Sequence, residues 1–328
     1  MPTTGDLEST YRPIQQQLDA LDGLLTEVLQ SDIPCVNEML QYASRYSGKR
    51  LRPALIFLIG NMVGTLGENH VKLGAVVEMI HMATLVHDDV LDRATVRRNA
   101  ESVNVRWNNK DAILLGDIMF SRSINLLVQI GSPRALELLT ASVSTLCEGE
   151  IHQNQLSGDP EVNEATYTEI IRRKTACLYS AGCELAALLA GADPRLVDAF
   201  SRFGMNLGTA FQIIDDCLDL TGDEKLAGKS LGTDIVNGKM TLPLIQLMDE
   251  LDSDDRDRVA AVIRNDAPDA SEIKALQSLL VAHGSVENAL AQAEGMVRDA
   301  VADLRPLLDA ESFAIVEAIT SFVINRQN

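Results

Sequence analysis

The chain has 328 residues, of which 46% are hydrophobic, and a formal net charge of −19 at pH 7. The excess of acidic residues argues against a nucleic-acid-binding protein, which would carry a basic surface, and against strong docking on anionic membranes. It does not exclude an anionic substrate, because local Lys and Arg side chains or bound metal ions can reverse the charge at a site.

Three features predict a cytoplasmic protein without a stable membrane anchor. No stretch approaches the ~18 uninterrupted apolar residues of a transmembrane helix. Residues 1–6 lack the basic start and the apolar run of a secretory signal. The five cysteines are odd in number, form no C-x-x-C pair and lie in apolar stretches, which is typical of reduced thiols in the cytosol.

Helical periodicity dominates the chain, and alternating strand patterns are hard to find. Apolar helices are predicted within residues 18–29, 53–66, 73–91 and 111–130. Two more are predicted to begin at Ser132-Pro133 and Asp193-Pro194, where an N-cap residue precedes a proline. The acidic run at 252–257 is interpreted as a solvated turn. We therefore predict an all-α fold with a single domain over residues 1–328.

The acidic pattern Asp-Asp-x-x-Asp occurs twice, at residues 88–92 and 215–219, each time inside an apolar, helix-like stretch. Residues i and i+4 project from nearly the same face of a helix, so the outer aspartates of each copy can share one cation. Clustered carboxylates repel one another unless positive charge lies between them. Mg²⁺ with bound phosphate oxygens is a natural candidate for that charge.

Basic residues lie near both acidic motifs. Residues 48–53 place three cations in four positions just before an apolar helix, and Arg97-Arg98 follows the first motif. Lys174 lies within a predicted helix, Lys229 lies in the glycine-containing segment 222–238, and Lys239 follows it. Each cation alone is more often solvated. Together with the carboxylates they suit a ligand with several phosphates, some neutralised by Mg²⁺ and others by Arg or Lys.

These motifs, in this order, resemble those of the trans-type polyprenyl diphosphate synthases, long-chain members included. The matching stretches are GKRLRP at 48–53, HDDVLDRATVRR at 87–98, GEIHQ at 149–153, KT at 174–175, FQIIDDCLD at 211–219 and GTDIVNGKMTLP at 232–243. The resemblance implies an all-α, isoprenoid-synthase-like bundle around a deep central cavity, usually a homodimer. It also implies that the two aspartate motifs face each other across the mouth of the cavity.

Enzymes of this family join an allylic diphosphate to isopentenyl diphosphate, and the resemblance implies a role for each matching residue. Asp88 and Asp92 would hold two Mg²⁺ and Asp215 a third, all bridging to the allylic diphosphate. The metal ligands would be supported by Asp89, Asp216 and Asp219. The allylic diphosphate would be held by Arg97, Lys174 and Lys229, with Thr175, Gln212 and Lys239 nearby. The diphosphate of isopentenyl diphosphate, bound without metal, would contact Lys49, Arg52, His81 and Arg98.

One of these positions has an alternative interpretation, and one neighbouring residue departs from the family pattern. His81 lies two turns before Asp88 on the same helical face, but a lone helical histidine is often a core residue. Asn99 follows the arginine pair where the family usually has glycine. Asn tolerates left-handed backbone geometry better than most residues, so we expect the turn to survive.

Side chains four or five residues before Asp88 are expected to point down the cavity. Short-chain relatives usually carry an aromatic residue there, whereas this chain has Ala83 and Thr84. The small side chains predict a long product of roughly C30–C50, because nothing bulky closes the tunnel. The alternatives are a short-chain synthase, a class I terpene cyclase, a regulatory subunit of a heteromeric synthase and an acidic scaffold without a ligand.

Overall fold

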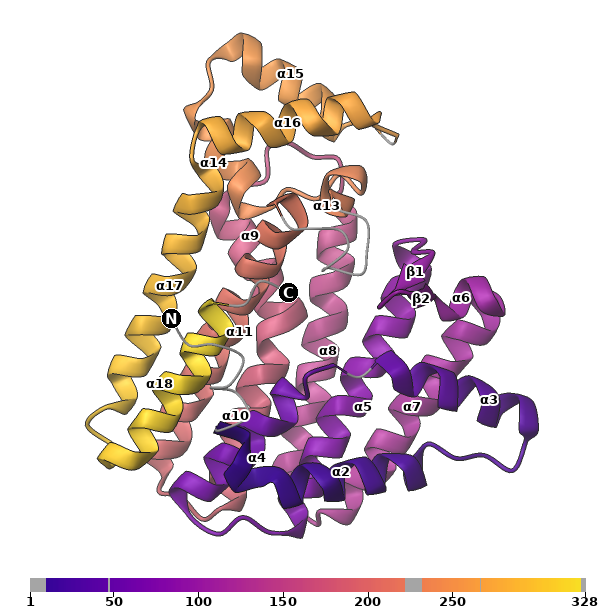
Figure 1. Ribbon diagram of the computed structural model, residues 1–328, viewed down its shortest axis with the longest axis vertical. Helices are drawn as coiled ribbons and strands as arrows, with labels where there is room; N and C mark the ends of the chain where they lie inside the picture. Colours follow the sequence, from indigo (N-terminus) through magenta and orange to yellow (C-terminus); the bar gives the residue numbers. More distant parts are fainter. Residues whose placement is uncertain (1–9, 47, 222–231, 266, 326–328) are drawn as a thin grey trace. The chain divides into compact units, whose positions relative to one another are not determined.

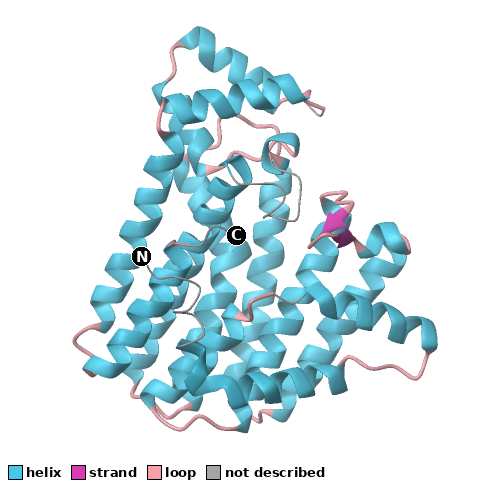
Figure 2. Ribbon diagram, viewed as in Figure 1, coloured by secondary structure: helices cyan, strands magenta, loops and turns pink. Residues whose placement is uncertain are grey.

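The computed structural model describes residues 10–46, 48–221, 232–265 and 267–325. Within these ranges helices joined by loops make up the chain, and the one sheet is a two-stranded hairpin (Figure 2). The predicted all-α fold is confirmed, and the hairpin is an addition that the sequence pattern did not predict. None of the described helices is both long and apolar enough to cross a bilayer.

The chain divides into two compact units, which are described separately. The first unit comprises Met1–Thr140, Ser180–Ser201 and Leu307–Ile319, and the second comprises Ala141–Tyr179, Arg202–Pro306 and Thr320–Asn328. Most of the boundaries fall inside helices: α8 (Pro133–Gln155), α10 (Cys177–Leu189), α11 (Pro194–Thr221) and α18 (Ala310–Ile324). Helices α8 and α11 begin at the two predicted prolines. A single domain over residues 1–328 stays a prediction.

Helix α5 is the centre of the first unit (Figure 1). The elements before α8 are η1 (Arg12–Ile14), α2 (Gln15–Val28), α3 (Pro34–Ala43), η2 (Ser44–Tyr46), α4 (Leu51–Val63), α5 (Glu68–Leu91), β1 (Val96–Arg97), β2 (Ala100–Glu101), α6 (Val103–Arg106) and α7 (Asn109–Gln129). Helix α5 packs against α2, α4 and α7 and is apolar around most of its circumference, as a buried helix must be.

Local hydrogen bonds determine where α5 and α7 begin. At the start of α5, the backbone N–H of Gly67 donates to Nδ1 of His70 at 3.2 Å, while Nε2 of His70 faces the carbonyl of Ala186 at 3.0 Å. Nδ1 therefore accepts and Nε2 carries the proton. Burial lowers the pKa of His70, which is 1% exposed. Helix α7 begins after Asn108, whose side chain accepts from the backbone N–H of Asp111.

The second unit contains most of the remaining helices. Besides parts of α8, α10, α11 and α18, these are α9 (Glu164–Ile171), the π-helical turn η3 (Arg172–Ala176), α13 (Thr233–Val236), α14 (Leu242–Glu250), α15 (Ser253–Ile263), α16 (Ala270–Ala282) and α17 (Ser285–Leu304). Helix α14 packs against α9, α16 and α17. The acidic run predicted as a turn is in fact the start of α15, because the Asp252 side chain accepts from the backbone N–H of Asp254 and Asp255.

The five cysteines all lie in the described part of the chain and form no disulfide bond, but they differ in burial. Cys177, Cys183 and Cys217 are buried, but Cys35 and Cys147 are exposed. The last two lie on the outward faces of α3 and α8 and not within the packed interior. Position inside an apolar stretch therefore did not predict burial for these two residues.

Candidate active site

The first aspartate motif forms the C-terminal end of α5. Asp88 and Asp92 are half-buried and one helical turn apart, and the Asp92 backbone N–H donates to the Asp88 carbonyl at 2.8 Å. Asp89 is 0% exposed and therefore does not share their accessible face. Two carboxylates near the negative end of a helix macrodipole are mutually unfavourable unless a cation offsets them. The geometry of Asp88 and Asp92 thus fits the predicted shared cation site.

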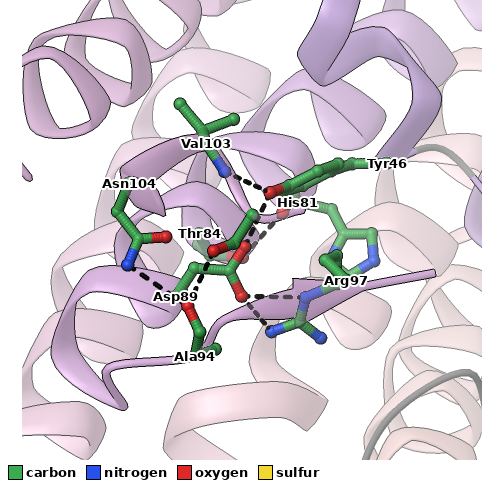
Figure 3. Close-up of polar contacts among 9 residues, drawn as sticks. Tyr46, His81, Thr84, Asp89, Ala94, Arg97, Val103 and Asn104 are labelled. Atoms are coloured by element: carbon green, nitrogen blue, oxygen red, sulfur yellow. Dashed lines mark hydrogen bonds and ion pairs between the residues drawn. The ribbon is translucent and has the colours of Figure 1, made fainter. Parts of the chain in front are cut away.

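Asp89 holds Arg97 of the following hairpin. Its Oδ1 accepts from Nε and Nη2 of Arg97 at 2.9 and 2.6 Å (Figure 3). Burial lowers the pKa of Arg97, but the Asp89 carboxylate outweighs it, so that the pKa is raised overall. Arg97 keeps a quarter of its side chain exposed. A supporting function for Asp89 was predicted, and the structure adds that its partner is Arg97.

Tyr46 is the residue of this region that the sequence analysis missed. Its hydroxyl donates to Oδ2 of Asp89 at 2.8 Å and accepts from the backbone N–H of Val103 at 2.9 Å (Figure 3). Burial and the Asp89 charge raise the pKa of Tyr46. A lone tyrosine two positions before the basic motif gave no signal that distinguishes it from an ordinary core residue.

The hairpin that carries Arg97 and Arg98 closes with a two-residue loop. Val96 pairs with Glu101 and Arg97 with Ala100. The loop residues Arg98 and Asn99 have φ angles of 52° and 60°, the positive values of a type I′ turn. The expectation that Asn99 preserves the turn is confirmed.

Arginines surround His81 in the first unit. Burial lowers the pKa of His81 well below its usual value, and Arg52, Arg98 and Arg97 lower it further. Burial also lowers the pKa of Arg98, aided by Arg97 and Arg50 although Glu78 opposes it. Neighbouring cations lower one another's pKa because each disfavours the charged form of the other. The arrangement of Arg52, His81 and Arg98 therefore suits an anionic group, as predicted for one diphosphate.

Gly48 and Lys49 lie on the segment between η2 and α4. A Cβ atom at Gly48 would lie 2.6 Å from Nη2 of Arg98, so a larger residue here would displace this guanidinium from its position. Lys49 is exposed, and its carbonyl accepts from the Tyr11 hydroxyl at 3.4 Å. Arg50, the third cation of the motif, is instead paired with Asp22 and Glu78 at 2.7 and 2.9 Å.

The two residues predicted to control product length lie on α5 between His81 and Asp88. Ala83 is 3% exposed, and the half-buried Thr84 donates its hydroxyl to the His81 carbonyl at 2.8 Å. Both side chains are small, and the hydroxyl of Thr84 is engaged with its own helix. Their effect on product length stays a prediction.

The second aspartate motif lies on α11 in the second unit, and its middle aspartate is again buried. Asp216 is 6% exposed and accepts from Nε2 of Gln212 at 2.8 Å and from the hydroxyl of Tyr167 at 2.6 Å. Gln212 in turn accepts from the hydroxyl of Thr175 at 2.8 Å. Burial raises the pKa of Asp216, and Asp234 raises it further. Tyr167 is a second residue that sequence reasoning missed.

Lys174 lies in the π-helical turn η3 and contacts α8. Its Nζ lies 2.6 Å from Oε2 of Glu150 and 2.9 Å from Oε1 of Gln153. A Cβ at Gly149 would lie 2.7 Å from the Lys174 backbone nitrogen. The GEIHQ motif therefore provides both the close approach and the acidic partner for Lys174. Single-turn π-helices of this kind are frequent at functional sites.

Asp219 anchors the segment that begins at Gly232. The backbone N–H of Gly232 donates to its carbonyl at 2.8 Å, and the N–H of Asp234 donates to its Oδ2 at 3.0 Å. Asp219 is 1% exposed, while Asp215 is half-buried. A supporting function for Asp219 fits this geometry better than a cation shared with Asp215. Lys239 Nζ lies 3.9 Å from Asp234, and Lys229 falls outside the described residues.

The described part of the chain gathers no three Asp, Glu, His or Cys side chains into a preformed metal cluster. A cation at either motif would therefore take several of its oxygen ligands from elsewhere. Carboxylate oxygens are the ligands that Mg²⁺ prefers, and Mg²⁺ is commonly completed by substrate phosphates and water. The accessible carboxylates of Asp88, Asp92 and Asp215 fit such a metal.

Comparison with known proteins shows the family. The polyprenyl synthetase family profile matches residues 33–280. The chain is 36% identical over 243 residues to octaprenyl diphosphate synthase from Escherichia coli (strain K12), which covers 74% of this chain and 75% of that one. It is 38% identical over 248 residues to all-trans-nonaprenyl-diphosphate synthase (geranyl-diphosphate specific) from Rhodobacter capsulatus, covering 75% of this chain and 76% of the relative.

A solved structure extends the similarity to the whole fold. The polyprenyl synthase from Caulobacter crescentus CB15, complexed with calcium and isoprenyl diphosphate, superposes with a TM-score of 0.95 at 30% identity. The match covers 100% of both chains. The resemblance stated from the motifs is confirmed: the chain belongs to the polyprenyl synthetase family and is a prenyltransferase.

Proposed function

We propose that this prenyltransferase condenses an allylic diphosphate with isopentenyl diphosphate and repeats the step to a long-chain polyprenyl diphosphate of about C30–C50, since small residues leave its tunnel open. The observation that carries the proposal is the pair of aspartate motifs. Asp88 and Asp92 of the first motif and Asp215 of the second have accessible carboxylates, and Arg97 and Lys174 provide cationic side chains. Support for the long product comes from relatives named octaprenyl and nonaprenyl diphosphate synthases.

Mg²⁺ is the proposed cofactor, with three ions in each active site. Asp88 and Asp92 would hold two of them and Asp215 the third. Bound there, Mg²⁺ would stabilise negative charge on the allylic diphosphate as its C–O bond breaks. Arg97 and Lys174 would hold the same diphosphate by charge-assisted hydrogen bonds, with Thr175, Gln212, Lys229 and Lys239 nearby.

Isopentenyl diphosphate would bind through Lys49, Arg52, His81 and Arg98 without a metal ion. The surroundings of His81 support this assignment. Burial lowers its pKa, and the neighbouring Arg52, Arg98 and Arg97 lower it further. A neutral His81 would donate one hydrogen bond to the diphosphate, and the guanidinium groups would supply the charge.

After ionisation, the allylic cation must be captured by the alkene of isopentenyl diphosphate and not by water. A dry aliphatic cavity achieves this. The released diphosphate would accept the proton lost in the final elimination. Ala83 and Thr84 would line the cavity and leave room for the growing chain.

Product analysis tests the proposal directly. The enzyme is incubated with Mg²⁺, labelled isopentenyl diphosphate and ten-, fifteen- or twenty-carbon allylic primers, and the products are measured by mass spectrometry. Long polyprenyl diphosphates are expected. Short products would support the short-chain alternative, and turnover of the primer without isopentenyl diphosphate would indicate a terpene cyclase. Asp88→Ala should abolish activity, whereas a purely regulatory subunit would keep its contribution.

The proposed assembly is a cytoplasmic homodimer. Helix α7 leaves the apolar residues Ile113, Leu114 and Val128 exposed at 44, 59 and 59%, which favours a partner surface on this helix. The five cysteines, two of them exposed, form no disulfide bond in the described structure, which fits a reducing compartment. Light scattering coupled to gel filtration should give twice the chain mass of 35.7 kDa, and a monomeric mass would contradict the dimer.

A further inference from the structure

Tyr46 lies beside the first aspartate motif, and both hydrogen-bonding functions of its hydroxyl are used. The O–H donates to Oδ2 of Asp89 at 2.8 Å, and the oxygen accepts from the backbone N–H of Val103 at 2.9 Å (Figure 3). The residue is 2% exposed and comes from the 3₁₀ turn η2, 43 positions away from Asp89. A buried hydroxyl held at both ends has a fixed orientation and imposes it on its partners.

Asp89 transmits this constraint to Arg97. The carboxylate is 0% exposed, with Tyr46 on Oδ2 and the Nε–Nη2 edge of Arg97 on Oδ1. Because both oxygens are engaged, Asp89 cannot rotate without breaking one of these bonds. The guanidinium plane of Arg97 is therefore set by a carboxylate that Tyr46 holds, and its Nη1 end is the part that this pairing leaves to face a ligand.

We infer that Tyr46 is a positioning residue that fixes Arg97, through Asp89, for contact with the diphosphate of the allylic substrate. The inference rests on the proposed function, in which Arg97 grips that diphosphate. Tyr46 itself is buried and does not touch the substrate. It restricts the rotation of the Arg97 side chain before the substrate binds. Binding then costs less conformational entropy, because this side chain is already ordered.

Two further observations support this role. Burial and the neighbouring Asp89 raise the pKa of Tyr46, so the hydroxyl remains protonated and donating at neutral pH. The second motif repeats the arrangement independently: the hydroxyl of Tyr167 donates to Oδ2 of Asp216, while Gln212 donates to Oδ1. The two tyrosines come from unrelated elements, η2 and α9. In both motifs, the second aspartate thus accepts a hydrogen bond from a buried tyrosine through one carboxylate oxygen. Its other oxygen accepts from a polar residue of the proposed site, Arg97 or Gln212.

The test compares Tyr46→Phe with Tyr42→Phe as a matched control. Tyr42 is also buried, at 7% exposure, and donates its hydroxyl to the carbonyl of Glu101 in the same hairpin at 2.7 Å, so its hydroxyl hydrogen-bonds a different partner from the Asp89–Arg97 pair. Each variant loses one buried hydroxyl. Tyr46→Phe should lower kcat/KM for the allylic diphosphate about tenfold, the lower end of what loss of a supporting contact costs, and leave KM for isopentenyl diphosphate unchanged. Tyr42→Phe should lower Tm alone.

A double-mutant cycle separates positioning from simple destabilisation. In an Arg97→Ala background, Tyr46→Phe should cause no further loss in kcat/KM, because the group that it positions is gone. A purely structural effect would reduce activity by the same factor in both backgrounds, and that result would overturn the inference. If Tyr46→Phe does not fold, Asp89→Asn tests the same connection, and an unchanged kcat/KM for the allylic diphosphate would refute it.

A spectroscopic measurement distinguishes failure of this inference from failure of the proposed function. The ¹⁵N-labelled Nε–H of Arg97 should give a sharp, slowly exchanging NMR signal in the wild-type protein and in Tyr42→Phe. In Tyr46→Phe it should broaden or exchange rapidly with solvent. An unchanged signal would contradict the positioning role even if the enzyme is active, and a lost signal would support it even if the substrates proved different.

Discussion

Arg50 connects α4 to α2 and α5 through two ion pairs that differ in burial. Its Nη2 lies 2.7 Å from Asp22, whose side chain is 61% exposed, and its Nη1 lies 2.9 Å from Glu78, whose side chain is 3% exposed. A solvated carboxylate gains little from a partner, whereas a buried one depends on it. Removal of Arg50 should therefore destabilise the protein almost entirely through Glu78.

The expected magnitudes follow from that burial. Arg50→Ala leaves the buried Glu78 without its guanidinium partner, which should lower the free energy of unfolding by about 3 kcal/mol. This value is at the lower end for a broken buried ion pair because the Arg50 side chain is 20% exposed. Asp22→Asn removes only the exposed pair and should cost less than about 1 kcal/mol.

Backbone strain at Arg50 acts in the opposite direction. The residue is the N-cap of α4 and has φ 54° and ψ 31°, a left-handed conformation that costs a non-glycine residue roughly 1 kcal/mol. Arg50→Gly relieves this strain and still breaks the ion pair, so its net cost should be about 2 kcal/mol. The stability order should be wild type, Asp22→Asn, Arg50→Gly and Arg50→Ala, from most to least stable.

Urea unfolding followed by circular dichroism measures this order, with the m-value compared among variants so that a shift in midpoint reports stability. Adding Glu78→Gln to Arg50→Ala should recover part of the loss, because a neutral amide costs less to bury than a carboxylate. The reasoning is refuted if Arg50→Gly is more stable than the wild type, or if Glu78→Gln recovers nothing.

Three further outcomes are expected. Ala83→Phe should shorten the product to about C15–C20, because a ring would fill the tunnel; an unchanged length by mass spectrometry would show that the floor lies elsewhere. Gly48→Ala should raise KM for isopentenyl diphosphate several-fold, because its Cβ would lie 2.6 Å from Nη2 of Arg98, while Gly23→Ala, with nothing within 4 Å, is a control that should keep both KM values. Burial lowers the pKa of His70 from 6.5, so below about pH 6.5 the unfolded chain binds a proton that the folded protein does not. The free energy of unfolding should therefore fall with decreasing pH, by at most about 1.4 kcal/mol per unit from this group. His70→Gln should flatten the slope, and an identical slope in urea titrations would exclude His70 as the cause.

The predictions that succeeded depend on local chemistry. An N-cap followed by proline correctly identified the starts of α8 and α11, because both signals act within one turn of the helix. Asn99 preserves the hairpin turn for a similarly local reason, its tolerance of positive φ. The prediction of a turn at 252–257 was wrong because Asp is favoured both in turns and at helix N-caps. The local sequence pattern does not distinguish the two.

The residues that were missed make their decisive contacts over long sequence distances. Tyr46 reaches Asp89 across 43 positions and Val103 across 57, and Tyr167 reaches Asp216 across 49. Periodicity and motif spacing carry no information at that range. The same limit applies to Arg50, which the sequence groups with the substrate cations but which the structure pairs with Asp22 and Glu78.

The left-handed geometry of Arg98 has a consequence for engineering. Arg98 occupies the first loop position of a type I′ turn, where glycine or asparagine is preferred, so a library screened for thermal stability alone should favour Arg98→Gly. That change would also remove a cation from beside His81. With the proposed role of Arg98 in binding isopentenyl diphosphate, stability and substrate recognition compete for the identity of a single loop residue. A stability-guided redesign of this hairpin is then expected to raise thermal stability and lower activity.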